Sequence, residues 1–192
     1  DVFIGDDERF FAAPASIDGL AALYEQHPSA VIVSGATDVG LWITKQMRHL
    51  PKIILTGGVK ALHEVKDAGG HISIGAAASY AEAMPALSSI DPDMGEVLRR
   101  LGSTQVRASG TVGGNIANGS PIGDTPPALI ALGATITLRK GAVRRRIAIE
   151  SDQHRGPDLG DVGVGKTAVD ADGQGARLLL VGTGQPQAFD HG

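Results

Sequence analysis

Apolar residues in the first third of the chain alternate between helical spacing and short continuous runs. Residues 17–24 carry an apolar side chain at every third or fourth position, and Ser16 before them is a suitable N-cap. The run 30–33 is apolar throughout and 52–55 is apolar after Lys52, a pattern typical of strands buried on both faces. Between them, residues 39–47 return to helical spacing. The pattern therefore predicts a strand–helix–strand unit with parallel strands and a right-handed crossover.

A second part with mixed periodicity follows. A hairpin is expected from strands at 62–66 and 71–74, because the turn between them holds two glycines that can take positive φ. Ser79 begins a helix, and Glu82 stands where it completes a capping box. The pattern then predicts two helices and a strand, over residues 94–101, 128–132 and 134–138.

The periodicity weakens from residue 142. Three arginines at 144–146 and the apolar residues 147–149 are compatible with the start of one more strand. Residues 150–177 are rich in Gly, Asp and Gln, a composition typical of a poorly packed segment. We therefore predict an α+β protein in three parts: a first lobe over 1–56, a second lobe over 57–141, and an atypical, poorly ordered tail over 142–192.

Composition restricts the chemistry of the chain. Among its 192 residues there are 27 glycines and no cysteine. The absence of cysteine excludes disulfides, thiolate zinc sites, a cysteine nucleophile and an iron–sulfur cluster ligated by this chain, and it is compatible with a cytoplasmic location. The net charge of −4 argues against nucleic-acid binding. No apolar run approaches the ~20 residues of a membrane span, and the six histidines lack metal-ligand spacing, so we predict no metal site.

Residues 34–38, the first loop, connect the predicted strand 30–33 to the helix that follows. Their small side chains let main-chain N–H groups face outward, and the helix start adds unpaired N–H groups. Such donors can bind a phosphate or pyrophosphate without Lys or Arg. The alternative is an ordinary strand-to-helix turn with Thr37 or Asp38 as N-cap. The carboxylate of Asp38 would repel an anion unless it turned back to the helix N–H groups.

Residues 108–124, the glycine-rich segment, are predicted to be neither a plain helix nor a strand. Short polar side chains of the kind that bond ribose or ribityl hydroxyls alternate there with glycines, which admit a bulky planar ligand. The alternative is a long surface loop. Two small-residue loops in one α/β segment indicate a dinucleotide, approached mainly by bare main chain. The glycines are Gly110, Gly113, Gly114, Gly119 and Gly123, and the polar residues are Thr111, Asn115, Asn118, Ser120 and Asp124.

The sequences at 34–46 (SGATDVGLWITKQ) and 110–124 (GTVGGNIANGSPIGD) together resemble the FAD-binding domain of xanthine dehydrogenase. The likeness is greatest to the small, FAD-carrying subunit of the bacterial two-subunit enzymes and runs from about residue 8 to 140. It implies the fold of vanillyl-alcohol oxidase and p-cresol methylhydroxylase, with a βαβ first lobe and an antiparallel sheet in the second. It also implies that electrons from a molybdenum centre pass through 2Fe–2S clusters to FAD, which hands a hydride to NAD⁺.

The resemblance further implies which residues contact FAD. Residues 32–39 would wrap the pyrophosphate, residues 111–115 would lie along the flavin and its phosphates, Asp124 would bind hydroxyl groups, and Leu101 would supply an apolar contact. No catalytic residue is expected, because the cofactor carries the chemistry. Individually these cofactor-binding residues are Ile32, Val33, Ser34, Gly35, Ala36, Thr37, Asp38, Val39, Leu101, Thr111, Val112, Gly113, Gly114, Asn115 and Asp124.

Two features depart from the family pattern. The Cys-rich iron–sulfur modules that precede this domain in the family are missing, and residues 142–192 lack the family's cap over the flavin with its late FAD contacts. We therefore expect an aberrant or truncated C-terminus, as a shifted reading frame would produce, and a chain that is inactive alone. Its expected partners are a molybdopterin-binding large subunit and a 2Fe–2S domain, with NAD as electron acceptor.

Two alternatives remain. The first is the FAD subunit of a carbon monoxide dehydrogenase or aldehyde oxidoreductase type of hydroxylase. Those subunits usually carry Ala-Gly-Gly where this chain has Ser34-Gly35-Ala36. The sequence therefore favours the xanthine dehydrogenase type over this alternative. The second is a truncated product that no longer holds FAD.

Overall fold

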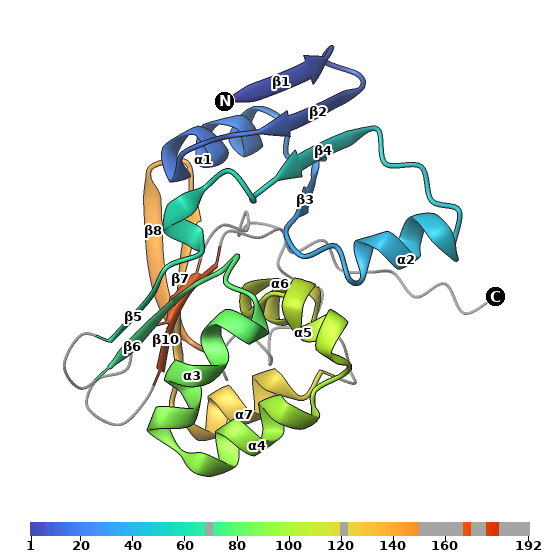
Figure 1. Ribbon diagram of the computed structural model, residues 1–192. Helices are drawn as coiled ribbons and strands as arrows, with labels where there is room; N and C mark the ends of the chain where they lie inside the picture. Colours follow the sequence, from blue (N-terminus) through green and yellow to red (C-terminus); the bar gives the residue numbers. More distant parts are fainter. Residues whose placement is uncertain (68–70, 120–122, 150–166, 170–175, 181–192) are drawn as a thin grey trace.

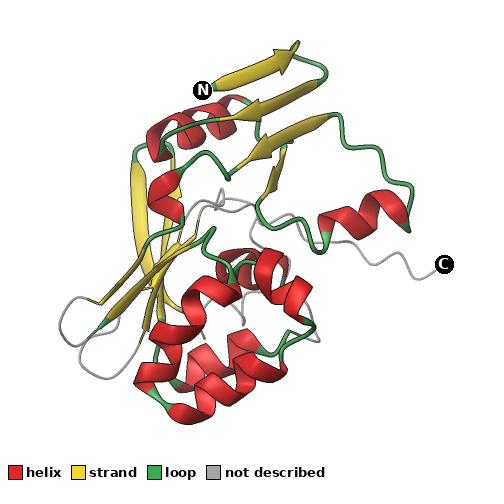
Figure 2. Ribbon diagram, viewed as in Figure 1, coloured by secondary structure: helices red, strands yellow, loops and turns green. Residues whose placement is uncertain are grey.

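The computed structural model describes residues 1–67, 71–119, 123–149, 167–169 and 176–180. A four-stranded sheet lies at one end of the molecule, a group of helices at the other, and further strands along one side (Figure 1). Figure 2 shows that the helices of the second half gather into one cluster, whereas α1 and α2 lie beside the first sheet.

The first sheet has the strand order β1-β2-β4-β3. Strand β3 (Val31–Val33) runs parallel to β4 (Lys52–Leu55), which confirms the predicted strand–helix–strand unit. Helix α1 (Ile17–Gln26) begins at the predicted N-cap, where the Ser16 hydroxyl accepts from Gly19 N–H. Helix α2 (Val39–Thr44) is shorter than predicted and buries none of its residues, so packing does not extend it.

Two strands at the N-terminus were not predicted. Strand β1 (Val2–Gly5) pairs antiparallel with β2 (Phe10–Ala13), and β2 pairs parallel with β4. Three of the four residues of β1 are consecutive apolar residues, without the alternation of apolar and polar residues that a half-buried strand shows, and all four are exposed. Pairing with a neighbouring strand, rather than sequence pattern, makes this segment extended.

The predicted hairpin forms from β5 (Val65–Asp67) and β6 (Ile72–Gly75), which pair antiparallel after the short 3₁₀ helix η1 (Lys60–Leu62). Strand β6 also pairs with β9 (Thr167–Val169) and β10 (Ala176–Leu180). The β6–β10 pairing is parallel, so this sheet is mixed and not purely antiparallel as predicted. Strands this far apart in sequence can run parallel because their connection is long enough to return to the starting edge.

Strands β7 (Thr135–Lys140) and β8 (Val143–Ala148) form an antiparallel pair over six residues of each strand. Strand β8 confirms the strand predicted to start at the three arginines, and Ile149 after it is fully buried. Apart from β9 and β10, the predicted tail beyond residue 149 lies outside the described residues.

In the described part of the chain, five helices follow β6. Helix α3 begins with the predicted capping box, since Ser79 Oγ accepts from Glu82 N–H while the Glu82 carboxylate accepts from Ser79 N–H at 2.7 Å. Strand β7 and α7 lie within two or three residues of their predicted positions. The helices are α3 (Tyr80–Ile90), α4 (Pro92–Arg100), α5 (Thr104–Ser109), α6 (Val112–Asn118) and α7 (Thr125–Ala131).

The glycine-rich segment is not one plain helix, as predicted, but it contains the helix α6, which was not predicted. The Thr111 hydroxyl accepts from Gly114 N–H at the start of this helix, and Gly119 ends it in the left-handed conformation, with φ of 59°. Val112 and Ile116 are buried on its inner face. Both ends are therefore capped and one face is anchored in the core, which outweighs the low helix propensity of its glycines.

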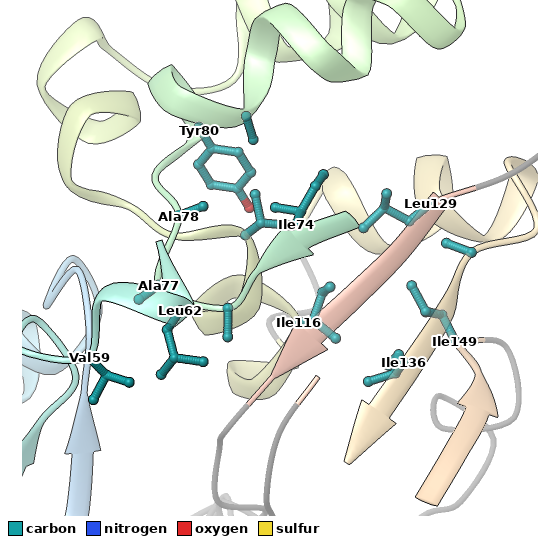
Figure 3. Close-up of a cluster of buried hydrophobic side chains, with 14 of the residues drawn as sticks. Val59, Leu62, Ile74, Ala77, Ala78, Tyr80, Ile116, Leu129, Ile136 and Ile149 are labelled. Carbon is teal, nitrogen blue, oxygen red and sulfur yellow. The ribbon is translucent and has the colours of Figure 1, made fainter. Parts of the chain in front are cut away.

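One hydrophobic core runs from the first sheet to β7 and β8. Figure 3 shows its central part, where Ile74, Ile116 and Leu129 lie close together and Tyr80 stands at the start of α3. Tyr80 is only 2% exposed. The start of α3 is thus held by the core, and so are the segments that contact it.

Candidate functional site

The first loop leaves β3 at Val33, whose carbonyl accepts from Thr56 N–H at 3.0 Å. Ala36 has a φ of 58°, a left-handed conformation that non-glycine residues rarely adopt. Ala36 and Thr37 are exposed. Asp38 is the N-cap of α2, but its side chain accepts no hydrogen bond from the helix. The start of α2 thus presents main-chain N–H groups without a side-chain cap, in an exposed turn.

The glycine-rich segment is held differently, by the residues 76–80. Tyr80 N–H donates to the Gly110 carbonyl at 3.0 Å, Val112 N–H to the Ala78 carbonyl at 3.0 Å, and Gly113 N–H to the Ala76 carbonyl at 3.1 Å. With the bridge between Ser79 and Thr111, these bonds form a short antiparallel ladder. The start of α6 is therefore fixed to the main chain before α3.

The main-chain N–H groups of residues 112–115, next to this ladder, all have acceptors within the protein. The N–H groups of Val112 and Gly113 bond to main-chain carbonyls, Gly114 N–H bonds to the Thr111 hydroxyl, and Asn115 N–H bonds to the Thr111 carbonyl. These four N–H groups therefore already have acceptors inside the protein, which the expectation of bare main-chain donors in both loops did not include. What this stretch can offer a ligand is the Thr111 hydroxyl and the Asn115 side chain.

The two predicted loops touch each other. A Cβ atom added at Gly35 would overlap the carbonyl oxygen of Ser109 and lie 3.1 Å from the α-carbon of Gly110. Figure 1 shows the same arrangement, with the loop between β3 and α2 next to α5 and α6. Gly35 is required here by close approach of two main chains and not by its φ angle. The structure thus brings together two segments that the sequence only suggested were related.

Asn115 carries an unpaired polar atom. Its Oδ1 is buried and has no hydrogen-bond partner in the described part of the molecule. A buried carbonyl oxygen without a donor costs about 1–3 kcal/mol, so such an atom fits a site that a ligand donor completes. This observation supports the fit of a polar ligand, such as a nucleotide with hydroxyl groups, next to α6.

Asp38 and Asp124 approach the same buried phenol. Burial raises the pKa of Tyr80 above its usual range, and the negative charges of Asp38 and Asp124 raise it further. One carboxylate from each predicted loop therefore lies within electrostatic range of one side chain. Asp124 is exposed, so its carboxylate is open to hydroxyl donors.

The other predicted residues serve mainly the fold in the part of the chain described. Ile32 pairs with Ile54 across β3 and β4, and Val33 is only 6% exposed. Val39 is half-buried at the start of α2. Leu101 lies in the core, and its carbonyl accepts from Arg107 of α5 at 3.1 Å, which ties it to the helix that ends beside Gly35.

Sequence reasoning missed the residues that join the two loops. Ser109 faces Gly35, while Tyr80 and Thr125 lie in the core behind the glycine-rich segment. One signal was available, the run of small residues 75–78 directly after β6. A Cβ atom at Gly75 would overlap the Leu62 carbonyl oxygen, so small residues there indicate close main-chain packing.

Two further features bear on the kind of site. Within the described ranges, no group of three or more His, Cys, Asp and Glu side chains could hold a metal ion. In the same part of the chain, no helix is both long and apolar enough to cross a membrane.

Comparison with known proteins identifies the family. Residues 7–164 match the family described as the FAD binding domain in molybdopterin dehydrogenase. The nicotine 6-hydroxylase medium subunit of Paenarthrobacter nicotinovorans is 27% identical over 144 residues, covering 74% of this chain and 50% of that protein. Xanthine dehydrogenase of Drosophila pseudoobscura pseudoobscura is 33% identical over 136 residues, covering 65% of this chain and 10% of that protein. The chain thus spans half the length of the first relative and a small part of the second.

Solved structures agree on the fold. Quinoline 2-oxidoreductase from Pseudomonas putida 86 matches with a TM-score of 0.74 and 23% identity, covering 84% of this chain and 57% of that one. Reconstituted CO dehydrogenase from Oligotropha carboxidovorans matches with a TM-score of 0.75 and 23% identity, covering 88% and 60%. The mixed α+β fold and the predicted family are confirmed. The chain belongs to the FAD-binding domains of the molybdopterin dehydrogenases, and its cofactor is FAD.

Proposed function

We propose that this chain is the flavin-carrying part of a xanthine dehydrogenase-type hydroxylase, in which electrons from a molybdenum centre reach FAD through 2Fe–2S clusters and leave to NAD⁺. The contact between Gly35 and residues 109–110 is the observation that carries the proposal, because it joins the two segments that would share one dinucleotide. The identity to xanthine dehydrogenase of the fruit fly supports the choice of enzyme.

The first loop would hold the FAD pyrophosphate over residues 32–39. The turn at Ala36 is exposed, and the start of α2 lacks a side-chain cap, so main-chain N–H groups there can bond to phosphate oxygens. The half-buried carboxylate of Asp38 makes no bond to the helix, and we assign it to a hydroxyl group and not to the phosphates, which it would repel.

The second half of the site would use side chains. Asn115 Oδ1, buried and without a donor, would accept from a ligand N–H or O–H group, and Thr111 can donate from the hydroxyl that already accepts from Gly114. The exposed carboxylate of Asp124 would accept from FAD hydroxyl groups. Leu101 would contribute apolar surface. When bound, FAD supplies the redox chemistry, and the chain binds and orients it.

A second function of the same class is the FAD subunit of a related hydroxylase. It is favoured by the likeness to the nicotine 6-hydroxylase medium subunit and by the fold shared with CO dehydrogenase. In either function, we propose a molybdopterin-binding large subunit and a 2Fe–2S domain as partners and the cytoplasm as the location. A truncated product that holds no FAD is the third candidate.

Flavin absorbance separates these candidates. We expect the purified chain, incubated with FAD and freed of excess, to retain partial absorbance near ~450 nm, where bound flavins absorb. Bleaching of that band by NADH would support the xanthine dehydrogenase type, and retention without bleaching would favour the related hydroxylases. Complete absence of retained flavin would favour the truncated product.

A glycine substitution tests the placement of the site. A Cβ atom at Gly114 would lie 2.6 Å from the Thr111 hydroxyl oxygen, so Gly114→Val should disrupt the cap of α6 and remove the retained flavin. Gly113→Val, at a buried glycine, should do the same. Gly57→Val is the control, because no atom lies within 4 Å of its Cβ position. Full flavin content in the Gly113 and Gly114 variants would show that the placement is wrong.

A further inference from the structure

Tyr80 connects three segments around the proposed site. Its N–H group donates to the Gly110 carbonyl, and its ring faces the position where a Cβ of Gly110 would lie, 3.5 Å from Cδ2. Its hydroxyl lies 2.8 Å from Thr125 Oγ1, 45 residues further along the chain. One side chain thus contacts the glycine-rich segment at one end and the start of α7 at the other.

Neither partner of this hydrogen bond can touch a ligand. Tyr80 is 2% exposed and Thr125 is fully buried. Thr125 follows Asp124 directly and is the first residue of α7, so the bond fixes the main chain from which the Asp124 carboxylate projects. Burial and the charges of Asp38 and Asp124 keep the phenol protonated, because they raise its pKa.

We propose that the Tyr80–Thr125 hydrogen bond positions the FAD site by fixing the separation between Gly110 and Asp124, the two ends of the glycine-rich segment. Tyr80 holds Gly110, which lies against Gly35, through its main chain, and holds the residue after Asp124 through its hydroxyl. Tyr80 and Thr125 are positioning residues and not ligands. This inference rests on the proposed function, in which the first loop, residues 111–115 and Asp124 bind one FAD.

The test removes the bond from each side. Tyr80→Phe removes one oxygen atom, and Thr125→Val replaces the other hydroxyl with a methyl group of similar size. We expect each variant to bind FAD about tenfold more weakly, as measured by quenching of flavin fluorescence in titrations of the full chain. The double variant should be no weaker than the weaker single variant, because both remove one interaction. Thr125→Ser, which keeps the hydroxyl, should bind like the unmodified chain.

Tyr24 provides a matched control. It is also a buried tyrosine, 9% exposed, and its hydroxyl donates to the Pro28 carbonyl at 2.9 Å at the end of α1. Tyr24→Phe therefore removes the same atom from a similar environment, away from both loops. We expect it to lower the unfolding temperature as Tyr80→Phe does but to leave the Kd for FAD within twofold of the unmodified value.

The outcomes are distinguishable. If the unmodified chain binds FAD and both Tyr80→Phe and Thr125→Val bind it equally well, the positioning role is overturned while the proposed function stands. If the unmodified chain binds no FAD, both are overturned. Because Thr125→Val breaks the same bond without altering Tyr80, the test does not depend on one variant folding.

Discussion

The first loop and the start of α6 both consist mainly of small residues, yet different contacts hold them in place. The N–H groups of residues 112–115 all bond within the protein, and Val112 and Gly113 are buried. In the first loop, Ala36 and Thr37 are exposed, Asp38 caps nothing, and α2 buries none of its residues. One half of the proposed site is therefore built into the core, and the other rests on it.

The difference indicates how each half can serve a ligand. A segment whose main chain is fully bonded is rigid and presents side chains at fixed positions, which lowers the ordering cost of binding. An exposed turn with an uncapped helix start keeps its main-chain donors available, at the cost of less support from packing. The contact at Gly35 is where the rigid half supports the exposed half.

The largest effect should come from breaking that contact. Gly35→Ala introduces a Cβ atom into the Ser109 carbonyl, a main-chain group that cannot rotate away. Overpacking of this kind typically costs 1–3 kcal/mol, and we expect about 3 kcal/mol because the clash is with main chain on both sides. Urea denaturation and FAD titration measure both consequences, and flavin binding should weaken at least tenfold, on the order of 1.4 kcal/mol.

Gly40→Ala is the control for this change. Gly40 lies in α2, five residues from Gly35, and no atom lies within 4 Å of its Cβ position. Alanine should keep or raise stability by up to about 1 kcal/mol, since it favours helix. Equal stability of the Gly35→Ala and Gly40→Ala variants would contradict the contact between the two loops.

A smaller, pH-dependent effect should come from the rigid half. The Ser79 N–H group holds the pKa of Glu82 below its usual value of 4.5, against a smaller opposing effect of burial. Because the folded pKa is lowered, this carboxylate stabilises the protein above about pH 4.5 and loses its contribution as the pH falls through the folded value. Glu82→Gln keeps an oxygen for the capping box but replaces a charged acceptor with a neutral one, so it should lower the free energy of unfolding at pH 7 by about 1 kcal/mol.

The unmodified protein and the Glu82→Gln variant should become equally stable in acid, where Glu82 is protonated and resembles glutamine. Urea denaturation of both proteins at pH ~7 and ~2 measures this convergence. Glu64→Gln is the control, since the Glu64 carboxylate is exposed and its ion pair with Lys66 lies outside the ladder. If the free energies of unfolding of the unmodified protein and the Glu82→Gln variant differed by the same amount at both pH values, the charge of Glu82 would not stabilise the start of α3.

The smallest effect is expected in the exposed half, at Ala36. Its left-handed conformation costs about 1–2 kcal/mol, whereas glycine adds about 0.4–1 kcal/mol of unfolded-chain entropy. At the middle of both ranges, Ala36→Gly should raise the free energy of unfolding by about 0.8 kcal/mol, as measured by urea denaturation. Ala36→Val, with a branched side chain at φ of 58°, should lower it. Equal stability of the two variants would argue against the left-handed turn.

The turn at Ala36 bears on the choice between the xanthine dehydrogenase type and related hydroxylases. The Ala-Gly-Gly turn expected of related hydroxylases would place glycine at the position of Ala36, and a φ of 58° is the conformation that glycine adopts without strain. Alanine there keeps the same turn at a small cost. The difference is therefore weak grounds for choosing between the xanthine dehydrogenase type and its relatives.

Much of the fold could be predicted where the local pattern was strong. The apolar runs of β3 and β4, the caps of α1 and α3 and the β5–β6 hairpin depend on neighbouring residues alone. Helix α6 was missed because its glycines favour loops, and only its capped ends and its contacts with residues 76–78 make it helical. Strand β1 was missed because its residues are exposed and only pairing with β2 extends them.

The sequence alone determined the family and the cofactor, because these follow from contiguous motifs. Only the tertiary structure decided that Gly35 contacts Ser109 and that the N–H groups of residues 112–115 bond to acceptors within the protein. It also decided that the Tyr80 hydroxyl forms a hydrogen bond with Thr125. Each of these joins residues that are distant in sequence or competes with a ligand for the same donor. Such pairings depend on how the whole chain packs, and no local pattern encodes them.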